Sequence, residues 1–373
     1  PRPTLSRVRR QRQMCIRDRA QGVLSSGRLC SESRFRVSTG GCALGAELRP
    51  DQEGGCPLVL APNEYVKRWV TPVRAALSFA LLWFLLVRVG DELSLSTVIG
   101  QLTAISLTLM SGAAAMLVVS YVLSTVRWRQ VIEALGLHDG FRPLLSHFLA
   151  GQFLSNALPT TVGGDVVRVA RLSRDTGEPP ASFASVVLDR LTGWLVLPLI
   201  TALGFGLNPA LRELGAQTKV AVAIAAAVFG LLVVLLTAAY ADTLGGRFVG
   251  RPGWQGFIDA VHLGFGKLLR RPRSTLLVIL AGFAYQFVLV ISAFMMALAL
   301  GIDIGLTTMM AFFPTVLIVQ VLPISIAGLG VREFMLVWLL SSVGVPYQQA
   351  IALGLVIWAM TAVTSLLGAP SLS

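Results

Sequence analysis

Charged side chains are scarce in this sequence of 373 residues. Asp, Glu, Lys and Arg make up 13% of the chain, whereas hydrophobic residues make up 54%. Soluble domains carry about 25% charged residues, so a water-soluble fold of this composition would leave much apolar surface in water. The composition therefore argues against a soluble enzyme and predicts an integral membrane protein.

Cysteine and histidine are also few, and their spacing forms no recognisable metal or redox site. The four cysteines all precede residue 57, none of them forms a C-x-x-C pair, and the three histidines are scattered. A P-loop is missing as well, so direct ATP hydrolysis is not expected. We predict neither a metal nor a cofactor.

The N-terminal residues 1–64 are rich in Arg, Ser and Gly and have no sustained hydrophobic period. The stretch QRQMCIRDR (11–19) resembles translated adapter sequence. We expect this segment to be artefactual or else a disordered tail, and it is excluded from the fold prediction. The polytopic membrane domain is predicted to be residues 65–373.

Long apolar stretches dominate that domain. About 20 mostly apolar residues are needed for a helix to cross the bilayer, and six stretches qualify or nearly qualify. They lie at about 72–89, 98–126, 182–206, 219–240, 274–301 and 349–368. Two further segments, about 143–172 and 307–343, begin as apolar helices and then break at Pro and Gly.

The two broken segments resemble each other. Residues 158–168 read LPTTVGGDVVR and residues 322–332 read LPISIAGLGVR, with five of eleven positions identical when Leu158 is aligned with Leu322. Three full spans separate the two copies, which inverts the second copy relative to the membrane. The predicted fold is therefore an all-α membrane protein of about six transmembrane helices plus two re-entrant segments. Its inverted halves are about 70–206 and 219–368, as in many secondary transporters.

The chemistry of the breaks points to an anion site. Proline removes a helix hydrogen bond and glycine permits unusual turns, so freed backbone groups must be buried in protein or line a wet cavity. The helix that restarts after each break directs its N-terminal amides at the turn, which favours anions. The predicted breaks are Pro159, Gly163, Gly164, Pro323, Gly328 and Gly330.

Arg168 and Arg332 end the two repeated motifs, and an arginine can hold a phosphate through two parallel hydrogen bonds. The alternative is a pair of structural kinks whose arginines snorkel to the interface, with Glu333 neutralising Arg332. The other candidate substrate-binding residues are Asn156, Asp165, Asp189 and Arg190. Asp165 is expected to pair with Arg168 on one helical face, and Asp189 is a second possible partner of Arg168.

The net charge of +12 is interpreted as a topology signal, because no basic stripe interleaved with aromatics suggests nucleic-acid binding. Lys and Arg gather in loops that all lie on the cytoplasmic side of the membrane if the first span runs from inside to outside and segment 143–172 re-enters without crossing the bilayer. We therefore predict a multi-pass protein of the cytoplasmic (inner) cell membrane with its N-terminus in the cytoplasm. Arg332 is the exception, on the outer side.

Several stretches together resemble the lysylphosphatidylglycerol synthase transmembrane, or flippase-like, family. They are GQF (151–153) with Asn156, LPTTVGGDVVRVARL (158–172), LDRLTGW (188–194) and LPISIAGLGVREF (322–334). The resemblance covers about residues 70–368. In two-domain members this region is implicated in moving an aminoacylated phospholipid between leaflets, while a separate C-terminal domain performs lysyl transfer. No such domain follows here, so the resemblance implies a stand-alone flippase-like member without lysyltransferase activity.

Other stand-alone members are linked to lipid-linked sugars or polyprenyl phosphates. Our leading hypothesis is therefore translocation of an anionic lipid, either aminoacyl or glycosyl-/polyprenyl-phosphate, with Arg168 and Arg332 holding phosphate from opposite sides. One alternative is a membrane enzyme of lipid-linked sugar metabolism that uses Asp165, Asp189 and Glu333. Another is a non-transporting partner. The expected partners are membrane lipids with anionic headgroups, and a homo-oligomer or a lipid-modifying enzyme is possible.

Overall fold

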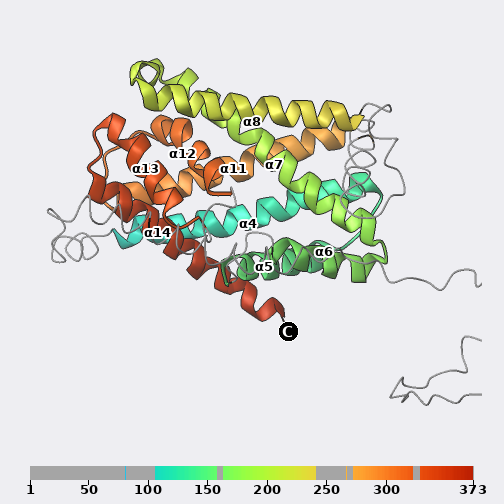
Figure 1. Ribbon diagram of the computed structural model, residues 1–373. Coiled ribbons are helices and arrows are strands. Elements are labelled where there is room, and N and C mark those ends of the chain that lie inside the picture. Colours follow the sequence, from blue (N-terminus) through green and yellow to red (C-terminus); the bar gives the residue numbers. More distant parts are fainter. Residues whose placement is uncertain are drawn as a thin grey trace, which may run out of the picture. The chain divides into compact units, whose positions relative to one another are not determined.

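Helices make up almost all of the chain that the structure describes (Figure 1). This computed structural model describes residues 80, 106–157, 163–240, 266, 272–321 and 328–372. The longer helices are α4 (Leu107–Leu135), α5 (Phe141–Ala157), α6 (Gly163–Thr176), α7 (Pro179–Leu207), α8 (Ala216–Tyr240), α11 (Pro272–Ala299), α12 (Leu306–Val321), α13 (Val331–Leu340) and α14 (Tyr347–Ser365). Short 3-10 helices are η1 (Pro209–Glu213), η3 (Ser341–Val343) and η4 (Leu366–Leu372).

Five helices within the described residues are long and apolar enough to cross a membrane, namely α4, α7, α8, α11 and α14 with its η4 extension. α8 illustrates why a bilayer is required. Its side chains of Leu231, Val234 and Leu235 are 58%, 61% and 48% exposed, and a face of this kind is unfavourable in water. The prediction of an all-α, multi-pass membrane protein is confirmed.

The predicted spans agree with these helices except at one end. The spans at 182–206, 219–240, 274–301 and 349–368 correspond to α7, α8, α11 and α14. α4 continues beyond the span end predicted at 126, to Leu135, and closes with Gly136 in the left-handed conformation, φ 87°; where the bilayer ends along this helix stays a prediction. Arg127, which lies within this helix, is buried and forms an ion pair with the carboxylate of Asp189. Of the span predicted at 72–89 the structure describes residue 80 alone, so this span stays a prediction.

Each predicted broken segment consists of two short helices, α5 with α6 and α12 with α13. The 17 residues of α5 rise about 25 Å at ~1.5 Å per residue, which is less than the ~30 Å hydrocarbon core. The connecting residues 158–162 and 322–327, with Pro159 and Pro323, lie outside the described residues. Re-entrance without crossing stays a prediction.

Helix packing follows the repeat that the two motifs suggested. In the alignment of the two motifs, the end of α4 at Leu135 matches the end of α11 at Ala299, and the end of α5 matches the end of α12. The pairings also recur: α5 contacts α6 and α14, and the corresponding α12 contacts α13 and α7.

The two equivalent helices α4 and α11 pack along each other in antiparallel fashion. The Ser106 N–H donates to the Ala299 carbonyl (3.4 Å) at one end of the pair, and Ser292 Oγ donates to the Ala113 carbonyl (2.9 Å) further along it. The inverted relation of the halves to a bilayer, and the total number of spans, stay predictions.

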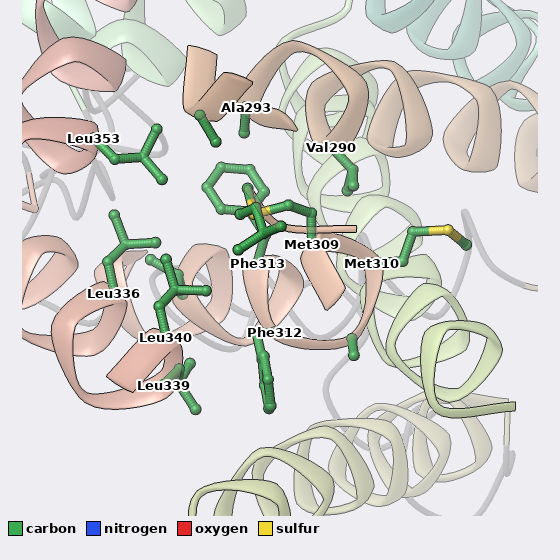
Figure 2. Close-up of a cluster of buried hydrophobic side chains, with 14 of the residues drawn as sticks. Val290, Ala293, Met309, Met310, Phe312, Phe313, Leu336, Leu339, Leu340 and Leu353 are labelled. Carbon is green, nitrogen blue, oxygen red and sulfur yellow. The ribbon is translucent and has the colours of Figure 1, made fainter. Parts of the chain in front are cut away.

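The larger hydrophobic core of the described chain lies where α11, α12, α13 and α14 meet (Figure 2). Met309 and Phe313 from α12 point toward Leu336 of α13 and Leu353 of α14. Phe312 makes an edge contact with Phe205 of α7, with ring centroids 5.7 Å apart. A smaller core surrounds the fully buried Trp128 of α4. Together these cores fix the helices that carry the polar residues of the membrane domain.

Candidate ligand cavity and its arginine network

Asp189 of α7 holds two arginines from two other helices. The Asp189 residue is 1% exposed. Arg127 Nε donates to Asp189 Oδ1 (2.8 Å), and Arg168 Nη2 donates to Asp189 Oδ2 (2.9 Å). A buried carboxylate is tolerable only when it is paired and hydrogen-bonded. The predicted contact between Asp189 and Arg168 is confirmed, whereas the part played by Arg127 was missed.

Asp165 extends this network to the half-exposed Arg190. Arg190 Nη2 lies 2.8 Å from Asp165 Oδ2, and Arg168 Nη1 lies 3.7 Å from Asp165 Oδ1, as predicted for the latter pair. Arg127, Arg168 and Arg190 therefore share two carboxylates, which leaves one positive charge in excess. Arg127 Nη1 and Arg168 Nε are buried without a hydrogen-bond partner in the described structure. The network as a whole favours an anion nearby.

Arg168 itself is enclosed by aromatic rings. Its Cζ lies 4.2 Å from the ring centroid of Trp128 and 5.1 Å from that of Phe148, and the residue is 6% exposed. Trp128 is in turn fixed because its Nε1 donates to Ser185 Oγ (3.2 Å). Arg168 therefore positions α6 against α4 and α7 and does not line the cavity described below.

Glycines allow the helices of the network to approach closely. A Cβ on Gly164 would meet the Gly151 carbonyl oxygen and Ser155 Oγ of α5, and a Cβ on Gly193 would lie 2.6 Å from Arg127 Nη1. Gly163 and Gly164 were predicted as breaks, and they form the first two residues of α6. Gly164 serves helix packing as well, because only a residue without a side chain fits there.

The second motif is arranged differently. Gly328 and Gly330 have φ values of 78° and 82°, a conformation that glycine adopts without strain. Arg332 Nη2 and Nε donate to Glu333 Oε1 (2.6 and 3.1 Å), while the Gly330 N–H donates to Glu333 Oε2 (2.7 Å). The expectation that the amide before α13 awaits a ligand anion is wrong for Gly330, because Glu333 already occupies it. The predicted neutralisation of Arg332 by Glu333 is confirmed.

A cavity of about 300 Å³ lies between the two halves. Its charged lining residues are Arg190 from α7 and Arg332 from α13. Arg332 is 5% exposed, and its Nη1 takes no part in the contact with Glu333. The uncharged polar and aromatic lining residues are Tyr121, Gln152, Ser155, Asn156, Trp194, Tyr285, Gln286, Ser292, Phe313, Gln320, Trp358 and Thr361.

Residues equivalent in the two halves meet in this cavity. Four lining pairs occupy matching positions in the alignment of the two motifs: Tyr121 with Tyr285, Asn156 with Gln320, Trp194 with Trp358, and Leu197 with Thr361. Of this set, Asn156 and Trp194 lie in the sequence motifs, and the offset that aligns Leu158 with Leu322 also pairs Trp194 with Trp358. The others were missed because an isolated Tyr or Gln in an apolar helix gives no signal until its equivalent is seen at the same cavity.

The structure thus divides the predicted site residues into two groups. Asn156, Arg190 and Arg332 line the cavity. Arg168, Asp189 and Glu333 are buried ion-pair partners behind it.

Asp165 lines a second, almost wholly apolar hollow of about 610 Å³ between α6 and α7. Arg190 and Trp194 line both spaces. The polar cavity is therefore next to a groove of hydrocarbon character, with the ion pair of Asp165 and Arg190 where they meet.

A separate titratable cluster ties the ends of α5 and α6 together. His147 Nε2 lies 2.7 Å from Asp175 Oδ2 and 3.9 Å from Asp139 Oδ2. Sequence spacing gave no hint of this cluster, because the three residues come from a loop and two helices.

The helices, the paired short segments and the polar cavity define a multi-pass membrane protein built around a buried polar site. The chain belongs to the lysylphosphatidylglycerol synthase TM region family, which matches residues 73–368. The family resemblance found in the motifs is thereby confirmed. No curated protein matches the chain.

Proposed function

We propose that this protein moves an anionic lipid between the two leaflets of the membrane. The observation that carries the proposal is the cavity between the halves, which places Arg190 of the first half and Arg332 of the second half around one space of about 300 Å³. Two arginines that line one space suit a phosphate, because an arginine can hold phosphate oxygens through two parallel hydrogen bonds. Family membership supports a flippase-like role.

The lipid would occupy both hollows at once. Its headgroup lies in the polar cavity, and its chain lies in the apolar groove between α6 and α7, which shares Arg190 and Trp194 with the cavity. Alternating exposure of this site by the two halves would carry the headgroup across. The direct phosphate contact first assigned to Arg168 passes to Arg190 in this proposal, because Arg168 is sealed by Trp128 and Asp189.

The proposal includes residence in the cytoplasmic membrane with the N-terminus in the cytoplasm. It also includes membrane lipids with anionic headgroups as partners, and a second copy of the chain or a lipid-modifying enzyme as a further partner. The excess positive charge of the Arg127, Arg168, Arg190 network supports the anionic character of the lipid.

The first prediction tests translocation. The full chain is reconstituted into liposomes with fluorescent phosphatidylglycerol, or a fluorescent polyprenyl phosphate, in both leaflets, and an impermeant quencher is added. Protein-free vesicles should lose about half of the signal, and the protein should carry the loss well beyond half. Arg190→Gln should reduce the excess at least about tenfold, because a charged contact to phosphate is lost. Arg129→Gln on α4, an exposed arginine paired with Glu133, should leave it unchanged.

Arg332 is tested with a double variant, because replacing Arg332 alone would leave the buried Glu333 carboxylate without its ion-pair partner. Arg332→Gln combined with Glu333→Gln should fold and lose translocation. Intact vesicles that lose only half the signal with both probes would contradict the proposal. A covalent change in the lipid, seen by mass spectrometry, would then favour the alternative of a membrane enzyme. Unchanged lipid would favour the alternative of a non-transporting partner.

A further inference from the structure

We infer that the cavity selects a headgroup made of phosphate and hydroxyl groups, such as a sugar phosphate or glycerol phosphate, over an aminoacyl headgroup that carries an ammonium group. The inference rests on the proposed function and narrows its substrate class. The chemistry of the cavity lining carries it.

Four carboxamide side chains line the cavity, beside five residues that carry a hydroxyl group. The carboxamides are Gln152, Asn156, Gln286 and Gln320. Each carboxamide offers both donor hydrogens and an acceptor oxygen, and a hydroxyl group likewise donates and accepts. A hydroxyl-rich headgroup can therefore exchange hydrogen bonds with these carboxamides in both directions, and neither partner needs a net charge for this.

Gln286 has an acceptor that is free to receive a hydrogen. The residue is 6% exposed and its Nε2 donates to the Gly193 carbonyl (3.3 Å), which fixes the amide orientation. Its Oε1 is buried with no hydrogen-bond partner in the described structure. An unsatisfied buried acceptor is costly, so this oxygen indicates a ligand that donates a hydrogen at this point.

A hydroxyl group fits that position better than an ammonium group, because the cavity offers no counter-ion. None of the described residues that line it is an Asp or a Glu. The three acids nearby are already bound: Asp165 to Arg190, Asp189 to two arginines, and Glu333 to Arg332.

The aromatic residues do not reverse this preference. An aromatic ring attracts cations at its face, but no carboxylate among the described lining residues adds to that attraction. The Tyr285 ring already has the Arg127 guanidinium carbon 5.1 Å from its centroid. Trp194 and Trp358 line the same cavity and provide large amphipathic rings that can contact a sugar or glycerol.

The second prediction compares three fluorescent lipids with identical chains in the same liposomes: phosphatidylglycerol, its lysyl ester, and a glucosyl phosphate lipid. The first and third should cross at least about tenfold faster than the lysyl ester, because the described lining residues include no carboxylate that could pair with the ammonium groups. The rates for phosphatidylglycerol and for the glucosyl phosphate lipid, compared with each other, show whether a glycerol or a sugar headgroup is preferred. Gln286→Leu should slow both, since it removes the free acceptor. A lysyl ester that crosses as fast as phosphatidylglycerol would overturn the inference while the proposed function stands.

A gain-of-function variant separates recognition from mere packing. Gln320→Glu, at a half-buried lining position, supplies the missing counter-ion and should raise the rate of the lysyl ester relative to phosphatidylglycerol.

If no lipid crosses, the proposed function fails. The inference is then decided in detergent by thermal stabilisation with soluble glycerophosphoglycerol and its lysyl ester. Equal stabilisation, or more by the lysyl ester, would overturn it.

Discussion

At the scale of single residues, the membrane domain depends on a buried carboxylate that compensates two arginines. Asp189 accepts from Arg127 Nε at 2.8 Å and from Arg168 Nη2 at 2.9 Å. Both arginines also lie over aromatic rings. Moving three charges out of water is expensive, and the geometry compensates for it only while all three are present.

The third prediction is that Asp189→Asn strongly destabilises the protein. It leaves two buried guanidinium groups without their counter-ion, and breaking a buried pair in this way costs about 3–5 kcal/mol. Thermal unfolding in detergent should show a midpoint several degrees lower, or loss of folded protein. Glu133→Gln is the matched control, because its pair with Arg129 is exposed on α4 and worth at most about 1 kcal/mol. Equal midpoints for the two variants would refute the structural role of Asp189.

At the scale of helices, α6 is held against α5 by contact between glycines. Gly151 and Gly164 face each other so closely that a Cβ on Gly164 would collide with a carbonyl oxygen of α5. The sequence identified Gly164 as part of a turn but could not identify this contact. Motifs report local backbone freedom, whereas the partner of a glycine is set by the packing of another helix.

The fourth prediction follows from that contact. Gly164→Ala should gain about 1 kcal/mol of helix propensity but lose more, since overpacking typically costs about 1–3 kcal/mol and the atoms in the way include backbone. Its unfolding midpoint in detergent should fall. Gly206→Ala in α7, where a Cβ meets nothing within 4 Å, should be neutral or slightly stabilising. A Gly164→Ala protein as stable as Gly206→Ala would exclude the close approach.

Helix positions were the most predictable part of the fold, because apolar length is a local signal. The end of α4 was missed for a non-local reason. Arg127 resembled the end of a span, but its charge is neutralised by Asp189, a residue 62 positions later in the chain. The pairing of Asp189 with Arg168 could be proposed from sequence because few charges exist in this domain and each needs a partner.

At the scale of the whole molecule, the repeat was predicted from one short motif, and at the same offset the ends of α4 and α5 match those of α11 and α12. The equivalent pairs Tyr121 with Tyr285 and Asn156 with Gln320 occupy one cavity. The equivalent helices α4 and α11 run antiparallel. The cavity itself could not be predicted, because it is formed by side chains from several helices whose relative placement depends on tertiary packing.

The fifth prediction is that equivalent loops of the two halves lie on opposite sides of the membrane. Glu178 precedes α7 and is exposed, and Tyr347 begins α14 and is 56% exposed. With the four native cysteines replaced by serine, Glu178→Cys and Tyr347→Cys are each treated in intact cells with an impermeant maleimide. The odd number of spans between the motifs inverts the second half, so Tyr347→Cys should react and Glu178→Cys should react only after permeabilisation. Reaction of both from the same side would mean parallel halves, and the two arginines of the cavity would then not be presented to opposite leaflets.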